Sequence, residues 1–171
     1  ADFEAGLRVI DISNPKVPVA VGSYNTSMTH AGSVAVAGRY AYVGDESAGL
    51  VVLDVSNPSA PSLVGSLAGM NAVGVALSGH YAYVIDGTGS NLRVVDISNP
   101  AAPILVASLR PNPSFTPLGI TISGKYAYIG ESAGSSIYVI DISNPTNPST
   151  AGSVITGTPH GLYISGKYLY V

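Results

Sequence analysis

The chain has 171 residues, which is enough for one domain with a buried core. Only 10% of them are charged, and the net charge of −3 excludes the basic surface that nucleic-acid binding requires. No apolar run approaches the roughly 18 residues of a membrane-spanning helix, and the absence of cysteine excludes disulfides and thiolate metal sites.

Two phrases recur along the chain and divide it into four repeats. Asp-(Ile/Val)-Ser-Asn-Pro recurs at spacings of 43, 42 and 45 residues, beginning at Asp11, Asp54, Asp96 and Asp141. Gly-x-Tyr-x-Tyr-(Val/Ile) recurs at spacings of 41, 45 and 42 residues, beginning at Gly38, Gly79, Gly124 and Gly166. A period near 43 residues is typical of repeat architectures in which each repeat is one small β-unit.

Each repeat contains four short strand patterns, here termed strands A to D. In chain order, residues 7–13 read as strand C, and a Ser-Asn-Pro turn leads from it to strand D. Strand A follows at residues 33–36, and a two-residue turn leads to strand B, Tyr-Ala-Tyr-Val. Strand A recurs at 74–77, 119–122 and 161–164, and no segment has the pattern of a helix.

Strands that are apolar on both faces must be covered on both, and a ring of four-stranded blades does this. We therefore predict an all-β fold: a β-propeller of four four-stranded antiparallel blades of about 43 residues, with residues 1–171 as a single domain. The phrases LRVIDISNP, VVLDVSNP, LRVVDISNP and YVIDISNP resemble those of the LVIVD-repeat family of bacterial and archaeal surface β-propellers. The resemblance covers the whole chain and implies a propeller at the cell surface, but it brings no catalytic residues.

The first and last residues read as two parts of one blade. Joining Val171 to Ala1 gives YLYVADFEAGLRVID, which matches YAYVGDESAGLVVLD in register. The repeats are thus circularly permuted, with a seam between strands B and C, and we expect residues 168–171 to pair with residues 7–12. The ring can close within one chain as four blades, or with an identical or continuing chain as a larger ring. We favour the larger ring, either eight blades from two copies or part of a longer propeller.

The aspartates of the Ser-Asn-Pro turns lie where they can accept backbone N–H bonds from their own turns. The register also places each of them across from the basic residue of its A–B turn. We therefore expect four ion pairs: Arg39 with Asp54, His80 with Asp96, Lys125 with Asp141, and Lys167 with Asp11 across the seam.

Four further acidic residues follow strand B at one repeat position: Asp2, Asp45, Asp86 and Glu131. A ring of carboxylates facing one way could bind Ca²⁺ or another hard cation. The alternative is that each carboxylate accepts backbone N–H bonds in its own B–C loop. No loop has the dense alternation of an EF-hand, so we predict no cofactor, with calcium as the open alternative.

The loops between strands D and A vary most in length among the repeats, and a binding face would be built there. Four residues of these loops near the mouth of the central channel are candidates: His30, Asn71, Thr116 and His160. The two histidines could form a metal site. Their repeat positions differ by two residues, which favours a polar pair at the channel mouth instead.

No enzyme motif is recognisable: no serine sits in a nucleophile elbow, and no glycine-rich loop opens a helix. We therefore predict a non-enzymatic extracellular or cell-surface propeller that serves as a structural or interaction module. Its expected partners are a protein or a glycan at the cell surface and a second copy of the chain that completes a larger ring, with no nucleic acid and no membrane span. The alternative is a propeller that binds a ligand or cation at the channel mouth and the carboxylate ring.

Overall fold

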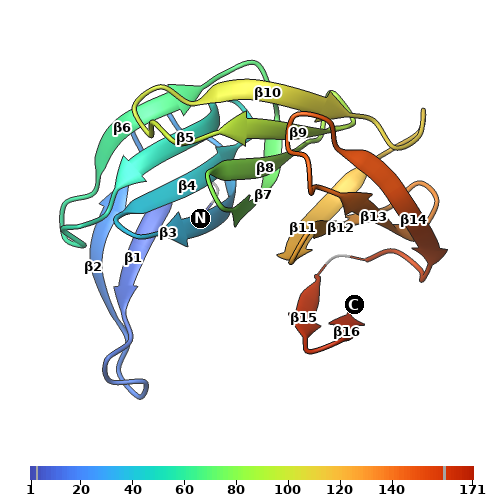
Figure 1. Ribbon diagram of the computed structural model, residues 1–171. Helices are drawn as coiled ribbons and strands as arrows, with labels where there is room; N and C mark the ends of the chain where they lie inside the picture. Colours follow the sequence, from blue (N-terminus) through green and yellow to red (C-terminus); the bar gives the residue numbers. More distant parts are fainter. Residues whose placement is uncertain (3, 160) are drawn as a thin grey trace.

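Strands and tight turns make up the computed structural model, which describes residues 1–2, 4–159 and 161–171 (Figure 1). Those residues contain no helix, as the sequence predicted, and hence no helix able to cross a membrane. In this described part of the chain, sixteen strands form five antiparallel sheets, in which neighbouring strands follow one another in the chain.

Three of the five sheets are four-stranded blades in the predicted order from A to D. The first blade comprises β3 (Ala31–Ala37), β4 (Tyr40–Asp45), β5 (Gly49–Asp54) and β6 (Ser62–Leu67). The second comprises β7 (Ala72–Ser78), β8 (Tyr81–Asp86), β9 (Asn91–Asp96) and β10 (Ile104–Leu109). The third comprises β11 (Pro117–Ser123), β12 (Tyr126–Glu131), β13 (Ser136–Asp141) and β14 (Ser149–Ile155).

The fourth blade is split into two half-blades, one near each end of the chain. Strands C and D of that blade are β1 (Leu7–Asp11) and β2 (Val19–Tyr24), and strands A and B are β15 (Tyr163–Ser165) and β16 (Tyr168–Tyr170). Among the described residues β1 pairs only with β2 and β16 only with β15. Three of the four predicted blades are thus complete, the fourth is divided at the predicted seam, and among the described residues no strand pairing joins its two halves.

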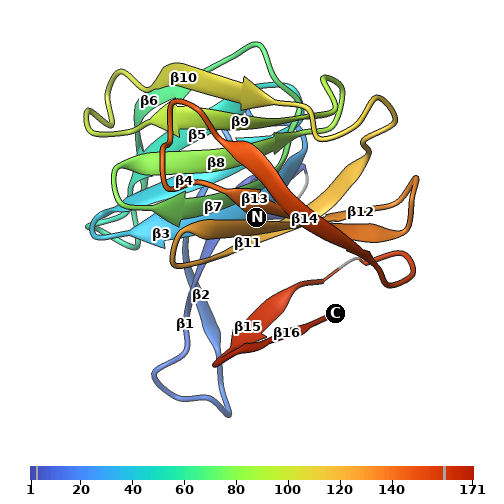
Figure 2. The ribbon, with the colours of Figure 1, turned by 45° about the vertical axis from the view of Figure 1, so that its right-hand side comes forward.

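The blades fan out into an open arc. The A strands β3, β7 and β11 contact one another in succession along the inner side of the arc, while the D strands lie at its outer rim (Figures 1 and 2). The two half-blades lie at opposite ends of the arc in Figure 1. The two half-blades accordingly form separate two-stranded sheets.

Apolar side chains are buried mainly between successive blades. One cluster, including Tyr42 and Val84, lies between the first and second blades. The next, including Tyr83 and Ile129, lies between the second and third. The tyrosines of strand B therefore pack between blades, as the sequence predicted, and each blade depends on its neighbours for burial.

Glycine in two D strands allows close approach of the next blade at the outer rim. A Cβ atom on Gly22 would collide with the backbone carbonyl of Pro58, and one on Gly65 with that of Pro100. Both prolines belong to the Ser-Asn-Pro turn of the following blade. Gly152 occupies the same position of β14, but the half-blade β15–β16 that follows has no Ser-Asn-Pro turn. A Cβ atom on Gly152 would therefore meet open space.

Candidate functional site

Two kinds of turn divide the arc into two faces, which we term the turn face and the loop face. The turn face carries the A–B turns and the Ser-Asn-Pro turns. The loop face carries the B–C and D–A loops, which are joined by backbone bonds such as Gly87 N–H to Asn71 O at 2.9 Å and Ser132 N–H to Thr116 O at 3.0 Å. His30, Asn71 and Thr116 therefore lie beside the B–C loops of their own blades, while His160 lies outside the described residues.

Asp45 ties the two loops of the first blade together. One of its oxygens, Oδ2, accepts the backbone N–H groups of Thr29 and His30 at 2.9 Å, and Oδ1 accepts those of Ser47 and Ala48 at 2.9 and 2.7 Å. Burial raises the pKa of this carboxyl, but the four donors outweigh burial and hold the pKa below its ordinary value. The fully buried Asp45 is thus an anionic clamp with both oxygens occupied.

Asp86 performs the same task in the second blade but also holds an arginine. Oδ1 accepts backbone N–H groups from Asn71 at 3.1 Å and Gly89 at 2.9 Å. Oδ2 accepts Nε–H of Arg93 at 2.8 Å. The Arg93 side chain is 21% exposed, and its other N–H groups form no hydrogen bond within the described part of the chain. A guanidinium is therefore positioned by a buried carboxylate while it still faces solvent.

A pocket of about 270 Å³ lies at this pair on the loop face. Both the D–A loop and the B–C loop contribute to it, and it is lined by Gly69, Met70, Asn71, Asp86, Thr88, Gly89 and Arg93. The pocket thus brings together Asn71 from the predicted binding face and Asp86 from the predicted carboxylate ring. This is the candidate site.

Glu131 differs from both aspartates. Its Oε1 accepts the backbone N–H of Gly134 at 2.7 Å, but Oε2 is buried without a hydrogen-bond partner. The strand-C position that holds Arg93 in the second blade holds Tyr138 here, and the Tyr138 hydroxyl accepts a hydrogen bond from the Asn112 side chain at 2.7 Å. The third blade therefore has no counterpart of the arginine site.

Asp2 lies exposed in the first half-blade, 3.5 Å from Nε of Arg8. This pair repeats the Asp86–Arg93 arrangement at the corresponding repeat position. Within the described ranges no three His, Asp or Glu side chains are grouped as metal ligands. The carboxylates of the three blades instead bind N–H groups of their own loops, the alternative given above, and a calcium site stays a prediction.

Arg93 is a site residue that was not predicted from the sequence. A signal for it was present: arginine is the second residue of strand C at positions 8 and 93, whereas Val51 and Tyr138 occupy that position elsewhere. In both repeats with arginine, an aspartate precedes it by six or seven residues across the B–C loop. That spacing brings the two side chains together on the loop face.

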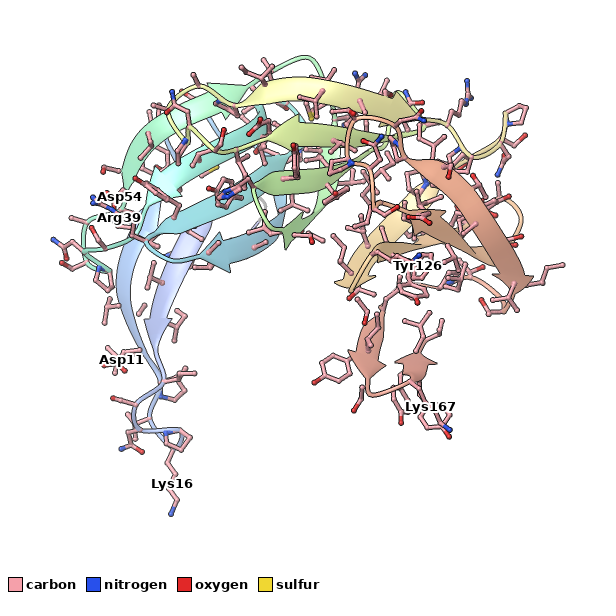
Figure 3. All side chains as sticks on the ribbon, viewed as in Figure 1. Asp11, Lys16, Arg39, Asp54, Tyr126 and Lys167 are labelled. Atoms are coloured by element: carbon pink, nitrogen blue, oxygen red, sulfur yellow. The ribbon has the colours of Figure 1, made fainter. Side chains whose placement is uncertain are left out.

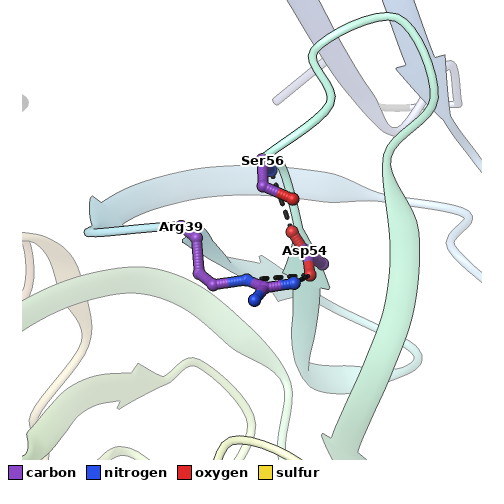
Figure 4. A network of polar contacts seen from close by, with 3 residues as sticks. All are labelled: Arg39, Asp54 and Ser56. Atoms are coloured by element: carbon purple, nitrogen blue, oxygen red, sulfur yellow. Dashed lines mark hydrogen bonds and ion pairs between the residues drawn. The ribbon is translucent and has the colours of Figure 1, made fainter.

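On the turn face, only one of the four predicted ion pairs forms. Arg39 donates to Asp54 through Nε at 3.0 Å and also through Nη2, and Asp54 accepts the backbone N–H of Ser56 as well (Figure 4). The hydrogen bond from Arg39 is the main cause that lowers the pKa of Asp54. All four turn aspartates accept the backbone N–H of the serine two residues on, at 2.8–2.9 Å.

The other three predicted pairs are corrected, since among the described residues none of them is an ion pair. The ammonium groups of Lys125 and Lys167 lie 5.2 and 5.5 Å from the ring centroids of the tyrosines that follow them. An exposed lysine gains little from a fixed carboxylate contact, and a cation over a tyrosine ring is a competing arrangement. Asp11 and Lys167 lie on different half-blades, so the fourth pair cannot form in this chain (Figure 3).

Four stretches of the chain match the family model of the LVIVD repeat: residues 1–26, 29–68, 69–110 and 118–156. The chain belongs to the LVIVD-repeat family. The resemblance found in the sequence is thereby confirmed for the repeats of all three blades and the first half-blade. No curated protein matches this LVIVD-repeat protein in sequence.

Solved structures share its fold at low sequence identity. A protein from Lactobacillus plantarum has a TM-score of 0.78 at 18% identity, over 98% of this chain and 52% of that one. The periplasmic gluconolactonase of Pseudomonas aeruginosa has a TM-score of 0.75 at 17% identity, over 90% and 52%. A provisionally named 6-phosphogluconolactonase from Bacteroides uniformis has a TM-score of 0.73 at 17% identity, over 95% and 56%. This LVIVD-repeat protein spans about half the length of each.

These comparisons contradict the prediction that the chain is not an enzyme. Propellers that share the fold over at least 90% of this chain are named as gluconolactonases, so the absence of a familiar motif does not exclude catalysis. The physical reason is that a propeller builds its sites from loop side chains contributed by separate blades. Local patterns such as a nucleophile elbow do not report on such a site.

Proposed function

We propose that this LVIVD-repeat protein acts outside the cytoplasm, where it binds a polyhydroxylated acid, or the lactone of such an acid, in the pocket at Asp86. The observation that carries the proposal is Arg93, which the buried Asp86 holds at a pocket of about 270 Å³. A volume of that size suits a ligand smaller than a typical drug molecule.

The chemistry of the lining supports this class of ligand. The free N–H groups of Arg93 can donate to a carboxylate or a carbonyl oxygen, and such charge-assisted bonds are strong. The Asn71 amide can donate and accept, as can the Thr88 hydroxyl, which suits several neighbouring hydroxyl groups. Because Asp86 holds Arg93 and both loops, the donors are fixed before the ligand arrives.

The structural neighbours support the same class. Two of them are named for lactones of gluconic acid or its phosphate, and one of these is named periplasmic. A free sugar acid and an acidic sugar within a cell-surface glycan present the same groups, a carboxylate beside hydroxyls. The glycan partner expected from the sequence is therefore one of the two sources of this ligand.

Calorimetric titration with sodium gluconate tests the proposal, with galacturonate oligosaccharides as the second arm. Arg93→Gln should weaken binding by roughly tenfold to hundredfold, because it removes the charged donors. The matched control is Arg39→Gln, which also breaks an Arg–Asp pair but lies on the turn face and should leave binding unchanged. Preference for the oligosaccharide identifies the glycan as the source, and preference for gluconate identifies the free acid.

A third titration uses glucono-δ-lactone with the release of acid followed at constant pH. Acid release above the uncatalysed rate, lost in Arg93→Gln and kept in Arg39→Gln, would extend the proposal from binding to hydrolysis. The absence of binding for all three compounds, or equal affinity in the two variants, would contradict the proposal.

A further inference from the structure

We infer that the protein hydrolyses the lactone held at Arg93, and that His30 is the general base of this reaction. The inference rests on the proposed function, to which it adds the reaction and the residue that transfers the proton. It comes from a group of side chains on the loop face of the first blade that the pocket does not include: Thr29, His30 and Ser47.

The buried Asp45 fixes the backbone of all three members of this group. Its Oδ2 accepts the backbone N–H groups of Thr29 and His30, both at 2.9 Å. Its Oδ1 accepts the backbone N–H of Ser47 at 2.9 Å. The D–A loop and the B–C loop of the first blade are therefore held together before a substrate arrives, as catalysis by positioned groups requires.

The side chains of the group form a chain of contacts that ends on the imidazole. The Thr29 hydroxyl donates to Ser47 Oγ at 2.8 Å, and Thr29 Oγ1 lies 3.3 Å from His30 Nδ1. Because the hydroxyl proton of Thr29 is directed to Ser47, its oxygen can accept the Nδ1–H of His30. That tautomer leaves Nε2 unprotonated, which is the state that a general base needs.

His30 lies beside the pocket because neighbouring A strands come close together at this end. In the first blade His30 occupies the repeat position of Asn71, and Asn71 lines the pocket. Two residues further along both strands, a Cβ atom on Gly32 would lie 3.8 Å from the carbonyl oxygen of Val73. The two D–A loops therefore end side by side on the inner side of the arc.

Strand B of the first blade shows the same close approach. A Cβ atom on Gly44 would collide with the carbonyl oxygen of Ala72, at 2.8 Å. Gly44 directly precedes Asp45, and Ala72 directly follows Asn71. The wall of the pocket formed by Asn71 thus lies against the loops that Asp45 holds, and a water molecule between His30 and a bound lactone can contact both.

The buried carboxylates of this region are poor alternatives as the base. Asp45 accepts backbone N–H groups at both oxygens, and Asp86 accepts hydrogen bonds at both of its oxygens as well. Neither can take up a proton without releasing a donor. In the two loops of the first blade, at 25–30 and 46–48, the ionisable side chains are His30 and Glu46. Histidine is the side chain best suited to proton transfer near neutral pH.

The reaction needs no reactant other than the lactone and water. Nε2 of His30 takes a proton from the water while the water oxygen bonds to the carbonyl carbon. The N–H groups of Arg93 stabilise the negative charge that develops on the carbonyl oxygen. The bond from that carbon to the ring oxygen then breaks, and the ring oxygen takes the proton from His30. The product is the open hydroxy acid, which ionises and releases one proton to the solvent.

Binding of the product tests the position of His30 without any turnover. Addition of sodium gluconate should shift the ring signals of His30 in NMR spectra. The signals of His80, which lies in an A–B turn on the turn face, should not move. Unchanged His30 signals under conditions where calorimetry shows bound gluconate would overturn the inference and leave the proposed function standing.

The rate of acid release from glucono-δ-lactone tests the chemistry. His30→Asn should lower kcat by roughly hundredfold with little change in the Kd of gluconate, whereas Arg93→Gln should weaken binding itself. His80→Asn is the matched control and should keep the wild-type rate. Acid release by the wild type no faster than in buffer, or an unchanged kcat in His30→Asn, would overturn the inference alone. Absence of gluconate binding in the wild type would contradict the proposed function, and the inference with it.

Two neighbours of His30 sharpen the test. Glu46→Gln should keep the wild-type rate, and a loss of acid release in Glu46→Gln but not in His30→Asn would make Glu46 the base and the inference wrong. Thr29 is a positioning residue, so Thr29→Val should lower kcat by roughly tenfold with little change in KM. Thr29→Ser, which keeps the hydroxyl, should restore kcat. An unchanged kcat in Thr29→Val would refute the positioning role of Thr29.

Discussion

The inner blades and the half-blades carry the same repeat, but the same positions have opposite environments in them. Ile97 and Ile142, which follow the turn aspartates of the second and third blades, are 6% and 4% exposed, whereas Ile12 in the first half-blade is 71% exposed. Likewise Tyr83 on β8 is 1% exposed and Tyr170 on β16 is 57% exposed. The backbone of a blade follows from its own repeat, whereas burial of its faces is supplied by its neighbours.

The comparison teaches where the stability of each region comes from. In the inner blades, the apolar side chains of one blade fill the space against the next, as in the clusters around Tyr42 and Tyr83. The first half-blade is covered only on the side of the first blade, where Leu7 packs with Val51 and Leu53, whereas Ile12 of the same half-blade is exposed. Because burial of each large side chain stabilises a fold by about 1.5–3 kcal/mol, the inner blades should contribute far more to the stability of this chain than the half-blades do.

The largest expected effect separates the two regions by replacing one tyrosine in each. Tyr83→Ala should lower the free energy of unfolding by about 3–5 kcal/mol at every protein concentration, because it opens a cavity between two blades. Tyr170→Ala should have a much smaller effect, because the Tyr170 side chain is 57% exposed. Urea denaturation measures both. A loss of stability in Tyr170→Ala as large as that in Tyr83→Ala would contradict the comparison.

The second test compares the two carboxylates at one repeat position. Asp45→Ala should lower the free energy of unfolding by about 3 kcal/mol, because four backbone N–H groups lose their acceptor in a buried place. Asp2→Ala, in the half-blade, removes an exposed side chain and should change the free energy of unfolding by less than about 0.5 kcal/mol. Similar losses in both variants would show that position, and not burial, sets the effect.

Acidification should reveal the same clamp. The pKa of Asp45 is lowered in the folded state, so its contribution to stability is complete above the ordinary value of 3.8 and is lost as the pH falls below 3.8 through the folded-state value. Urea midpoints measured from neutral to strongly acidic pH should therefore decline less steeply in Asp45→Ala than in the wild type. An equally steep decline of the urea midpoint with falling pH in the two proteins would refute this role of Asp45.

A smaller effect of opposite sign is expected within the inner blades. Glu131→Gln should raise the free energy of unfolding by about 1 kcal/mol at neutral pH, because Oε2 is buried without a donor and the amide removes its charge. Asp86→Asn is the control and should be destabilising, since it weakens the contact with Arg93. Destabilisation by Glu131→Gln would mean that a bound water or ion satisfies this oxygen.

The smallest effect is expected on the turn face. Arg39→Ala removes the one predicted ion pair that forms, and Lys125→Ala removes a basic residue at the same position without an ion pair. Because both sites are exposed, the two variants should differ from the wild type by no more than the scatter of thermal unfolding, and high salt should abolish any difference. A clear loss confined to Arg39→Ala would show that the pair stabilises the fold.

Local patterns in the sequence predicted the parts of the fold that short-range chemistry determines. The A–B turns form at the expected glycines, with φ near +57° at Gly38 and Gly79. The turn aspartates accept the expected N–H groups, since Ser-Asn-Pro fixes the donor two residues away. Strand order and register followed from the period of the repeat.

The remaining features depend on geometry that a repeat does not encode. Register allows β16 to pair with β1, but the rotation between blades decides whether one chain can bring them together. Strand pairing places Lys125 near Asp141, but a flexible exposed ammonium is not held there. The Asp86–Arg93 site arises where the B–C loop brings both side chains into one pocket. The sequence feature that could have predicted this site is the arginine shared by strand C at positions 8 and 93.

The close contact between Gly65 and the Pro100 carbonyl has a consequence for the number of blades. In a propeller, the angle between neighbouring blades grows as their spacing at the outer rim increases relative to their spacing at the central axis. Glycine at the rim keeps that spacing small, so the angle is small and more blades are needed to close a ring. A larger residue at position 65 should push neighbouring blades apart at the rim and favour rings with fewer blades, so this glycine helps to set the number of blades in a ring.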